Sequence, residues 1–449
     1  METLKTNTKQ HGFFTYFSFC CLFLFVVVCL IFNLFNKDIY TYLEVYFFAF
    51  VLFVGCIILP LVLGKTKRIK FKDLNKKTLT PLICLILFMI WATISLFFAT
   101  DKTLALFDTL YRGEGLLMYF AYAIIFISAF SIKNIKFRQN LIRLFICVGL
   151  FVSVFLIIEK LAFSWINILD CWFSLPWHNP NHSGYFLTMA IIASAMNYVF
   201  DKNLGFKISS IIAMFFMNVA LCLNDSFGSE LAVCVSMFVV LALVLLTNKK
   251  QWKLLLTVFA VYLTSCLLGA TLQIVWLNAK NTIFDNFVGF FKDIACVFAD
   301  ISQEGGPSAD ADIAGTNRWG LWKECFKNMK EKPFFGIGIN CQHVVNPALE
   351  SSRPHNELLQ FASTMGIPAG VFYLTAIIST IVIALKQIKQ LSTTTTTCLA
   401  VSVAYFISSL FGVTLPYTFI FYITFLGLAM GGLNFFKQNK NQISIETNT

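Results

Sequence analysis

Residues 81–99 read PLICLILFMIWATISLFFA, a run without a charged side chain. A helix needs about 20 predominantly apolar residues to cross the hydrocarbon core of a bilayer, so this run predicts a membrane-spanning helix. The sequence therefore predicts an all-α fold, a polytopic membrane helix bundle of about 12 transmembrane helices. The other apolar runs fall at about 13–35, 41–63, 115–132, 141–162, 183–200, 208–223, 227–246, 254–274, 365–385, 396–413 and 416–435.

The composition supports a membrane protein. Hydrophobic residues make up 58% of the chain and charged residues 13%, and the mean hydropathy is +0.74. A soluble protein of average composition carries about 25% charged residues, so the bilayer is the expected solvent. The 14 cysteines are scattered without a C-x-x-C pair, and those in apolar runs are expected to pack as small hydrophobic residues. The first run, 13–35, is long enough to remain as a span rather than to be removed as a signal peptide.

Lysine and arginine residues indicate the orientation. If the N-terminus is cytoplasmic, the segments on that side, including KTKRIKFKDLNKK at 65–77, hold 22 of the 34 cationic residues and four of the 23 acidic residues. Such an excess of positive charge is typical of the cytoplasmic side of a membrane. Both termini are therefore expected in the cytoplasm. The net charge of +11 reflects this orientation, and no nucleic-acid partner is predicted.

One long segment interrupts the pattern of short loops. Residues 275–355 lie between the ninth and tenth predicted spans and are expected on the extracytoplasmic side. The predicted organisation is therefore a membrane bundle of nine helices in 1–274, a large extracytoplasmic loop in 275–355 and a bundle of three helices in 356–449.

An amphipathic helix is predicted within this loop. Residues 301–317 are polar and glycine-rich, and the sequence NRWGLWKECFKNMKEKP at 317–333 then changes to a helical period. The pattern predicts a helix on the outer membrane surface that ends at Pro333. Its apolar residues at helical spacing, with the lysines on another face, are Trp319, Trp322, Phe326 and Met329.

Polar chemistry gathers at the predicted outer face. Carriers that use an ion gradient usually keep ionisable groups near the bilayer centre, and few are predicted there. This distribution favours an enzyme acting at the outer leaflet. The residues concerned are Glu44, Glu159, Asp225, Glu230, His178, His182, His343, His355, Arg112, Arg318 and Arg353.

His355 is the main catalytic candidate, in the stretch SSRPHNELLQ at 351–360. Pro354 suits the first turn of a helix, so His355 and Asn356 are expected in the first turn of the tenth span. A helix N-terminus disfavours imidazolium and attracts anions such as phosphate. His355 is therefore either a neutral proton acceptor beside an anion or an interfacial histidine hydrated by water.

Two arginines are candidates for binding phosphate. Arg318 opens the predicted amphipathic helix, and arginine binds phosphate oxygens in a bidentate manner. Arg112 is followed by Gly113 and Gly115 in YRGEGLL at 111–117, and these glycines would allow a ligand to approach the backbone closely. The alternatives are an interfacial arginine whose stem packs on apolar surface and a charge at the end of a loop.

Two outer segments contain further polar residues. HNPNHSGYF at 178–186 has histidines four residues apart, but Pro180 opposes a regular helical turn between them and no third ligand is evident. No metal site and no cofactor are therefore predicted. NDSFGSE at 224–230 offers Asp225 and Glu230 as alternative bases.

Taken in order, these motifs resemble one family. The order is YRGEGLL, NPNHSGYF, the polar break at 224–230, a long outer loop ending in NRWGLW and EKPFFGIGIN, and then PHNELLQ. It is similar to the O-antigen ligase and O-antigen polymerase superfamily of bacterial membrane glycosyltransferases. The resemblance covers roughly residues 90–385.

The resemblance implies a metal-independent enzyme with a GT-C-type fold in the bacterial cytoplasmic (inner) membrane, with its active site facing outside. Such an enzyme transfers or polymerises an oligosaccharide linked to undecaprenyl diphosphate onto an acceptor hydroxyl of a glycan, a lipid or a wall polymer. His355 and Arg318 match the family's catalytic histidine and diphosphate-binding arginine. Ser226, Phe227 and Gly228 stand where many ligases have Ser-Arg-Gly, so Arg112 or Arg353 is expected to compensate. The expected substrate-binding residues are Arg112, Arg353, Asn356, Trp319, Trp322, Asn181 and His182.

The alternative reading of the same bundle is a transporter or flippase of a polysaccharide or lipid-linked glycan. It would require cations lining a central cavity that opens to both sides of the membrane. Within the enzyme reading, ligase and polymerase share the donor and differ in the acceptor, so both remain open.

Overall fold

The computed structural model describes residues 17, 19–27, 74, 76–109, 113–163, 177, 179–302, 314, 317–347 and 353–434. Within them every regular element is a helix, as the sequence predicts. The bundle helices are α3 (Leu79–Leu96), α5 (Leu116–Phe130), α6 (Ile135–Ile158), α8 (Pro180–Phe200), α9 (Leu204–Leu223), α10 (Phe227–Thr247), α11 (Trp252–Val275), α17 (Ile367–Lys386), α18 (Thr393–Ser409) and α19 (Pro416–Asn434). The remaining α-helices are α4 (Lys102–Phe107), α12 (Ile283–Ser302), α14 (Arg318–Glu331), α15 (Gln342–Val345) and α16 (Glu357–Thr364). Short turns are η2 (Lys76–Thr78), η3 (Glu159–Phe163), η4 (Lys249–Gln251) and η5 (Ile388–Gln390).

In the described part of the chain, eight helices are long and apolar enough to cross a membrane: α3, α6 with η3, α8, α9, α10, α11 with η4, α17 and α19. α5 is apolar but has 15 residues, and α18 has 17. Each predicted run from 81–99 onward corresponds to one of these ten helices. Residues 17 and 19–27 of the first run are helical, whereas the run 41–63 lies outside the described residues. The class of polytopic helical membrane protein is confirmed, and the total of 12 spans stays a prediction.

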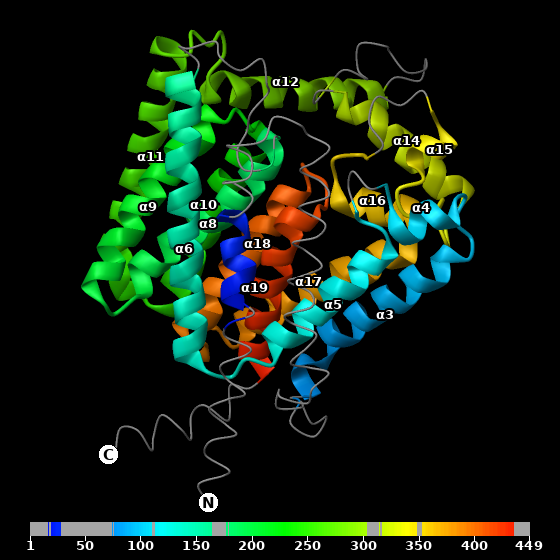
Figure 1. The fold of residues 1–449 in the computed structure, drawn as a ribbon, viewed down its shortest axis with the longest axis horizontal. Coiled ribbons are helices and arrows are strands. Elements are labelled where there is room, and N and C mark those ends of the chain that lie inside the picture. The colour runs from blue at the N-terminus through cyan, green and yellow to red at the C-terminus, as the bar shows by residue number, and fades with distance from the viewer. Residues whose placement is uncertain are drawn as a thin grey trace, which may run out of the picture.

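α8 and α19 lie at the centre of the bundle, where their spanning segments are 89% and 94% buried. Glycines bring α19 into backbone contact with α5: a Cβ at Gly431 would lie 2.3 Å from the Phe130 carbonyl oxygen. Small residues at helix interfaces are typical of membrane bundles, because close packing rather than the hydrophobic effect holds helices together in lipid. Figure 1 shows α18 and α19 between the α6 and α8–α11 group and the α3–α5 pair.

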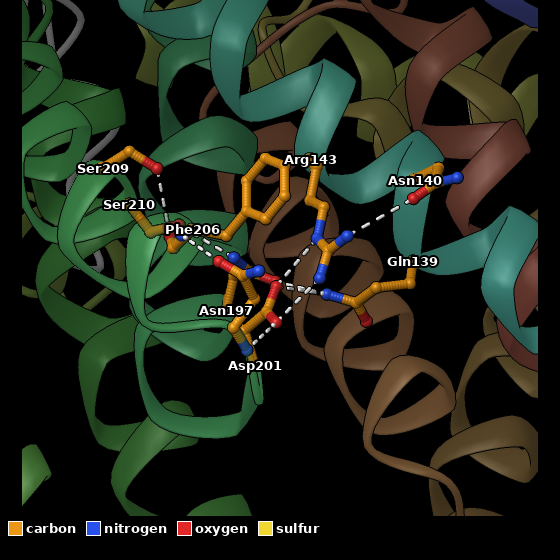
Figure 2. Close-up of polar contacts among 9 residues, drawn as sticks. Gln139, Asn140, Arg143, Asn197, Asp201, Phe206, Ser209 and Ser210 are labelled. Atoms are coloured by element: carbon orange, nitrogen blue, oxygen red, sulfur yellow. Dashed lines mark hydrogen bonds and ion pairs between the residues drawn. The ribbon is translucent and has the colours of Figure 1, made fainter.

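An ion pair joins α6 to the connection between α8 and α9 (Figure 2). Arg143 donates from Nε and Nη2 to the two Asp201 carboxylate oxygens, at 2.9 and 2.8 Å. Gln139 donates to Asp201 and to Asn197, and the Asn197 amide donates to the Ser210 hydroxyl. Burial raises the pKa of Asp201, but the hydrogen bonds from Arg143 and its neighbours outweigh burial and hold that pKa below its usual value. The cluster therefore ties three helices together at one end of the bundle.

The segment between α11 and α17 contains more helix than the sequence interpretation predicts. α14 matches the predicted amphipathic helix, and Pro333 follows its end. α12 is a helix of 20 residues that the interpretation missed, because its apolar residues alternate with charged ones and do not form a continuous run. Residues 303–313, most of the expected polar lead-in, lie outside the described part of the chain.

Candidate functional site

The predicted site residues that the structure describes gather at the end of the bundle opposite the Arg143–Asp201 ion pair. α8, α10 and α19 begin at this end, and α12, α14 and α16 lie across it (Figure 1). Arg112 and His178 lie outside the described residues. The geometry below therefore concerns the other candidates.

His355 lies just before α16 and not within it. The helix begins at Glu357, and Asn356 is its N-cap, whose side-chain oxygen accepts a hydrogen bond from the Leu359 amide at 3.1 Å. The expectation that His355 and Asn356 belong to the first turn is therefore wrong. Pro354 suggests a helix start at the histidine, but the Asn356 side chain caps a helix that begins only at Glu357. His355 has a φ of 51°. A non-glycine residue in this left-handed region is strained, and such strain often occurs at functional sites.

A glycine-rich loop after α14 holds the far end of α16. The Gly338 amide donates to the Thr364 carbonyl oxygen at 2.8 Å, and a Cβ at Gly336 would lie 2.4 Å from the Thr364 carbonyl carbon. Gly366 has a φ of +96°, and a Cβ there would lie 1.9 Å from the Phe334 carbonyl oxygen. The fragment PFFGIG at 333–338 and residues 363–366 at the end of α16 are therefore two sides of one backbone interface that positions α16.

Arg353 is buried in an ion-pair network. It contacts the Glu114 carboxylate at 2.6 Å and the Asp108 carboxylate at 3.3 Å, and it donates to the Thr414 carbonyl oxygen. Burial lowers the pKa of Arg353, but the Glu114 and Asp108 carboxylates outweigh it and raise that pKa above its usual value. Burial raises the pKa of Glu114 to about 7, against the opposing effect of Arg353. The short contact and the raised pKa of Arg353 indicate that the Arg353 guanidinium stays charged beside Glu114.

This network has a structural consequence for the site. It ties the segment before His355 to the connection between α4 and α5 and to the connection between α18 and α19. With only 3% of its side chain exposed, Arg353 is placed to position this segment. A role for Arg353 in binding a diphosphate stays a prediction.

α14 contacts the same segment through a tryptophan. The Trp322 indole N–H donates to the Pro354 carbonyl oxygen at 2.8 Å, directly beside His355. Arg318 lies one helical turn earlier and therefore on the same face of α14 as Trp322. The Trp319 indole N–H donates to the Asp300 carboxylate at 2.7 Å, which joins α14 to α12. Both indole N–H groups thus fix α14 between α12 and the histidine segment.

Arg318 reaches the start of α10. A Cβ at Gly228 would lie 3.9 Å from Arg318 Nη1 and 3.0 Å from the Phe411 side chain. The Arg318 guanidinium is also near enough to the Tyr185 hydroxyl for a charge interaction. The structure therefore brings together Arg318 of α14, the SFG motif of α10 and Tyr185 of α8.

The start of α8 completes this side of the site. The Ser226 hydroxyl donates to the Asn181 side-chain oxygen at 3.1 Å and lies 3.0 Å from the Ser229 hydroxyl. The His182 ring lies beside Tyr417 of α19, with ring centroids 6.1 Å apart. Pro180 occupies the first turn of α8, so this helix begins between the two histidines of HNPNHSGYF.

Sequence reasoning missed Glu357, which lies two residues after His355. Its side chain is fully buried, and burial raises the pKa of Glu357 to about 8. Neither carboxyl oxygen makes a hydrogen bond of good geometry within the described part of the chain, although the Ser409, Tyr373 and Thr414 hydroxyls are near enough to favour the ionised form. At neutral pH the Glu357 carboxyl is therefore mostly protonated. Its position beside the histidine was the only signal in the sequence.

The fold and this site define a broad class of protein. The chain is a helical membrane protein with a histidine, an arginine and a buried acid network gathered at one end of the bundle. Residues 212–374 match the model of the family described as O-antigen ligase. This match confirms the resemblance of the chain to the O-antigen ligase superfamily and includes Arg318, Trp322 and His355. Among the curated proteins, none matches the chain.

Proposed function

We propose that the protein is a glycosyltransferase that transfers or polymerises an undecaprenyl-diphosphate-linked oligosaccharide onto an acceptor hydroxyl. The family match supports a membrane glycan ligase or polymerase at the level of the family. The single observation that carries the proposal further is the Trp322 hydrogen bond to the Pro354 carbonyl. It joins the helix of Arg318 to the segment of His355, which supports the assignment of these two residues to one catalytic site.

Each residue has a distinct role in this reaction. The acceptor oxygen attacks the anomeric carbon of the donor sugar, the bond from that carbon to the diphosphate oxygen breaks, and the diphosphate leaves on its lipid. His355 takes the proton of the acceptor hydroxyl, and Arg318 binds the diphosphate oxygens as negative charge develops on them. The cationic side chain stabilises the leaving group without a metal ion, so neither a metal nor a cofactor belongs to the proposal.

The surroundings of these two residues suit a lipid-linked donor. Trp319 and Trp322 flank the site on α14, and their rings can contact a sugar while their N–H groups hold the helix. Asn356, Asn181 and His182 supply hydrogen-bonding groups, and Arg112 is a further candidate for the diphosphate. We place the site at the outer leaflet of a bacterial cytoplasmic membrane, with both termini in the cytoplasm, from the distribution of positive charge.

A His355→Ala variant tests the proposal in cells that contain no other copy of the protein. Loss of a general base typically costs about 10²–10⁴-fold in rate, so the lipid-linked donor should accumulate on the outer leaflet while the amount of protein stays unchanged. The matched control is His343→Ala, because His343 is an exposed histidine of α15 outside the site. The measurement is mass spectrometry of the lipid extract from each strain.

The outcomes distinguish the alternatives. Single repeat units on the carrier would indicate a blocked polymerase, and long chains on the carrier would indicate a blocked ligase. Donor retained on the inner leaflet would support the transporter instead. Unchanged surface glycan with no accumulated donor would contradict a role for His355 in transfer.

A further inference from the structure

We infer that α12 is an in-plane membrane helix whose apolar face is seated among the acyl chains of the outer leaflet. The sequence assigns that role to α14, but the side-chain contacts of the two helices favour α12. The inference concerns lipid contact and does not depend on the proposed transfer reaction.

An exposed apolar stripe runs along α12. Its members recur at positions that one face of a helix presents, and more than half of each side chain is exposed. In α14, by contrast, both tryptophans are half-buried and use their indole N–H groups in contacts within the protein. The stripe consists of Phe284 (52% exposed), Val288 (57%), Phe291 (67%), Phe298 (68%) and Ile301 (65%).

The neighbouring face of α12 is fixed on the bundle. Phe287 and Phe290 pack against Phe227 of α10, with ring centroids 5.5 and 5.9 Å apart, and Phe290 also packs against Phe411. These contacts determine the rotation of α12 about its own axis. The stripe of exposed phenylalanines therefore lies beside the bundle at the level of the helix starts.

The stripe continues the exposed apolar surface of a candidate spanning helix. α11 ends in Ile274 and Val275, which are 55% and 70% exposed, and Trp276 follows, 42% exposed. Tryptophan is enriched where membranes meet water. α12 begins a few residues later and crosses the end of the bundle (Figure 1). Exposed apolar residues thus occur both at the end of α11 and at the start of α12, where Phe284 opens the stripe. We therefore assign lipid acyl chains as the occupant of the stripe.

The polar residues of α12 take other positions around the helix. Lys292 is exposed, and the Asp300 carboxylate binds the Trp319 indole and lies 3.3 Å from Lys323. A helix with an apolar face in lipid and charges elsewhere is the pattern of an interfacial helix. Through Asp300, the depth of α12 in the membrane also sets the position of α14.

The experiment uses photocrosslinking of the full-length protein in nanodiscs made of phosphatidylethanolamine and phosphatidylglycerol. p-Benzoylphenylalanine replaces Phe291 in one variant and Asp293 in a second, because Asp293 lies on the side of α12 opposite the stripe, about half a turn from Phe284. Replacement of Leu267, which is 57% exposed on α11, is the positive control for lipid contact. Intact-mass spectrometry after irradiation identifies the adducts.

A phospholipid adduct is expected at position 291, at a yield similar to that at position 267, with loss of that adduct at position 293. A crosslink from position 291 to protein, within the chain or to a second copy, would overturn the inference because protein would then cover the stripe. No adduct at position 291 beside a normal yield at position 267 would also overturn it, because that result would place the stripe in water.

Discussion

At the scale of single residues, Glu357 shows how burial sets the state of a side chain. The carboxyl is fully buried beside the histidine segment, and the Arg353 guanidinium nearby already contacts two other acids. A buried carboxylate without its own cation is costly, so the group retains its proton. Glu357 therefore differs from Glu114, which contacts Arg353 at 2.6 Å.

This difference predicts a pH dependence of stability. Burial raises the pKa of Glu357 from 4.5 to about 8, so the unfolded chain ionises first as the pH rises. The stability contributed by the protonated carboxyl is complete below about pH 4.5, falls as the pH rises through 8 and then levels off. The loss from this one group is on the order of 5 kcal/mol. Glu357→Gln keeps the shape without the titration, so its melting temperature in detergent should fall less between pH 5 and pH 8.5 than that of the wild type. Equal slopes for the two proteins would contradict the assignment.

The residue scale also shows what sequence reasoning can and cannot find. His355 and Arg318 stand out because polar residues are scarce in an apolar chain and occur in motifs with a recognisable order. The pairing of Arg353 with Glu114 joins residues 239 positions apart, and no local pattern indicates it. Arg353 thus has the charge expected of a phosphate ligand, but its partners depend on tertiary packing.

At the scale of secondary-structure elements, the break between α16 and α17 determines how the site is supported. The predicted run 365–385 locates α17 correctly, because an apolar run of about twenty residues indicates a helix whose side chains favour lipid. It says nothing about α16, an eight-residue helix held by the glycine-rich loop after α14. Short helices such as α4 and α15 are missed for the same reason: their stability comes from packing and caps.

Glycine substitutions test this support. Gly366 has a positive φ, and a Cβ there would lie 1.9 Å from the Phe334 carbonyl oxygen, so Gly366→Ala should destabilise the protein by more than about 1 kcal/mol. Gly289 lies within α12 with no atom within 4 Å of an added Cβ, so Gly289→Ala should stabilise its helix by about 1 kcal/mol. Thermal unfolding followed by size-exclusion chromatography compares the two variants. A Gly366→Ala protein as stable as the wild type would show that the loop interface can relax.

At the scale of the whole molecule, the orientation of the bundle decides which solvent the site meets. Hydropathy predicts where spans lie because each must satisfy its own backbone and bury apolar side chains in lipid. The alternation of the described helices agrees with the predicted sides. Arg143 pairs with Asp201, which follows the end of α8, whereas α16, which follows the His355 segment, lies toward the opposite end of the bundle (Figure 1). Which end faces the cytoplasm follows from the positive charges alone and stays a prediction.

A cysteine already present in the chain tests the orientation. Cys296 is exposed on α12, and it lies about half a turn around the helix from Phe298 of the apolar stripe. If the α12 end faces outside, a membrane-impermeant maleimide should modify Cys296 in intact cells. A cysteine introduced as Lys202→Cys, beside Asp201 at the other end, should react only after the membrane is permeabilised. Peptide mass spectrometry assigns the modified residue in each case, and Cys296→Ser should abolish the first signal. Labelling of position 202 in intact cells, with Cys296 protected, would show that the bundle has the opposite orientation. The proposed transfer site would then face the cytoplasm, where a donor on the outer leaflet could not reach it.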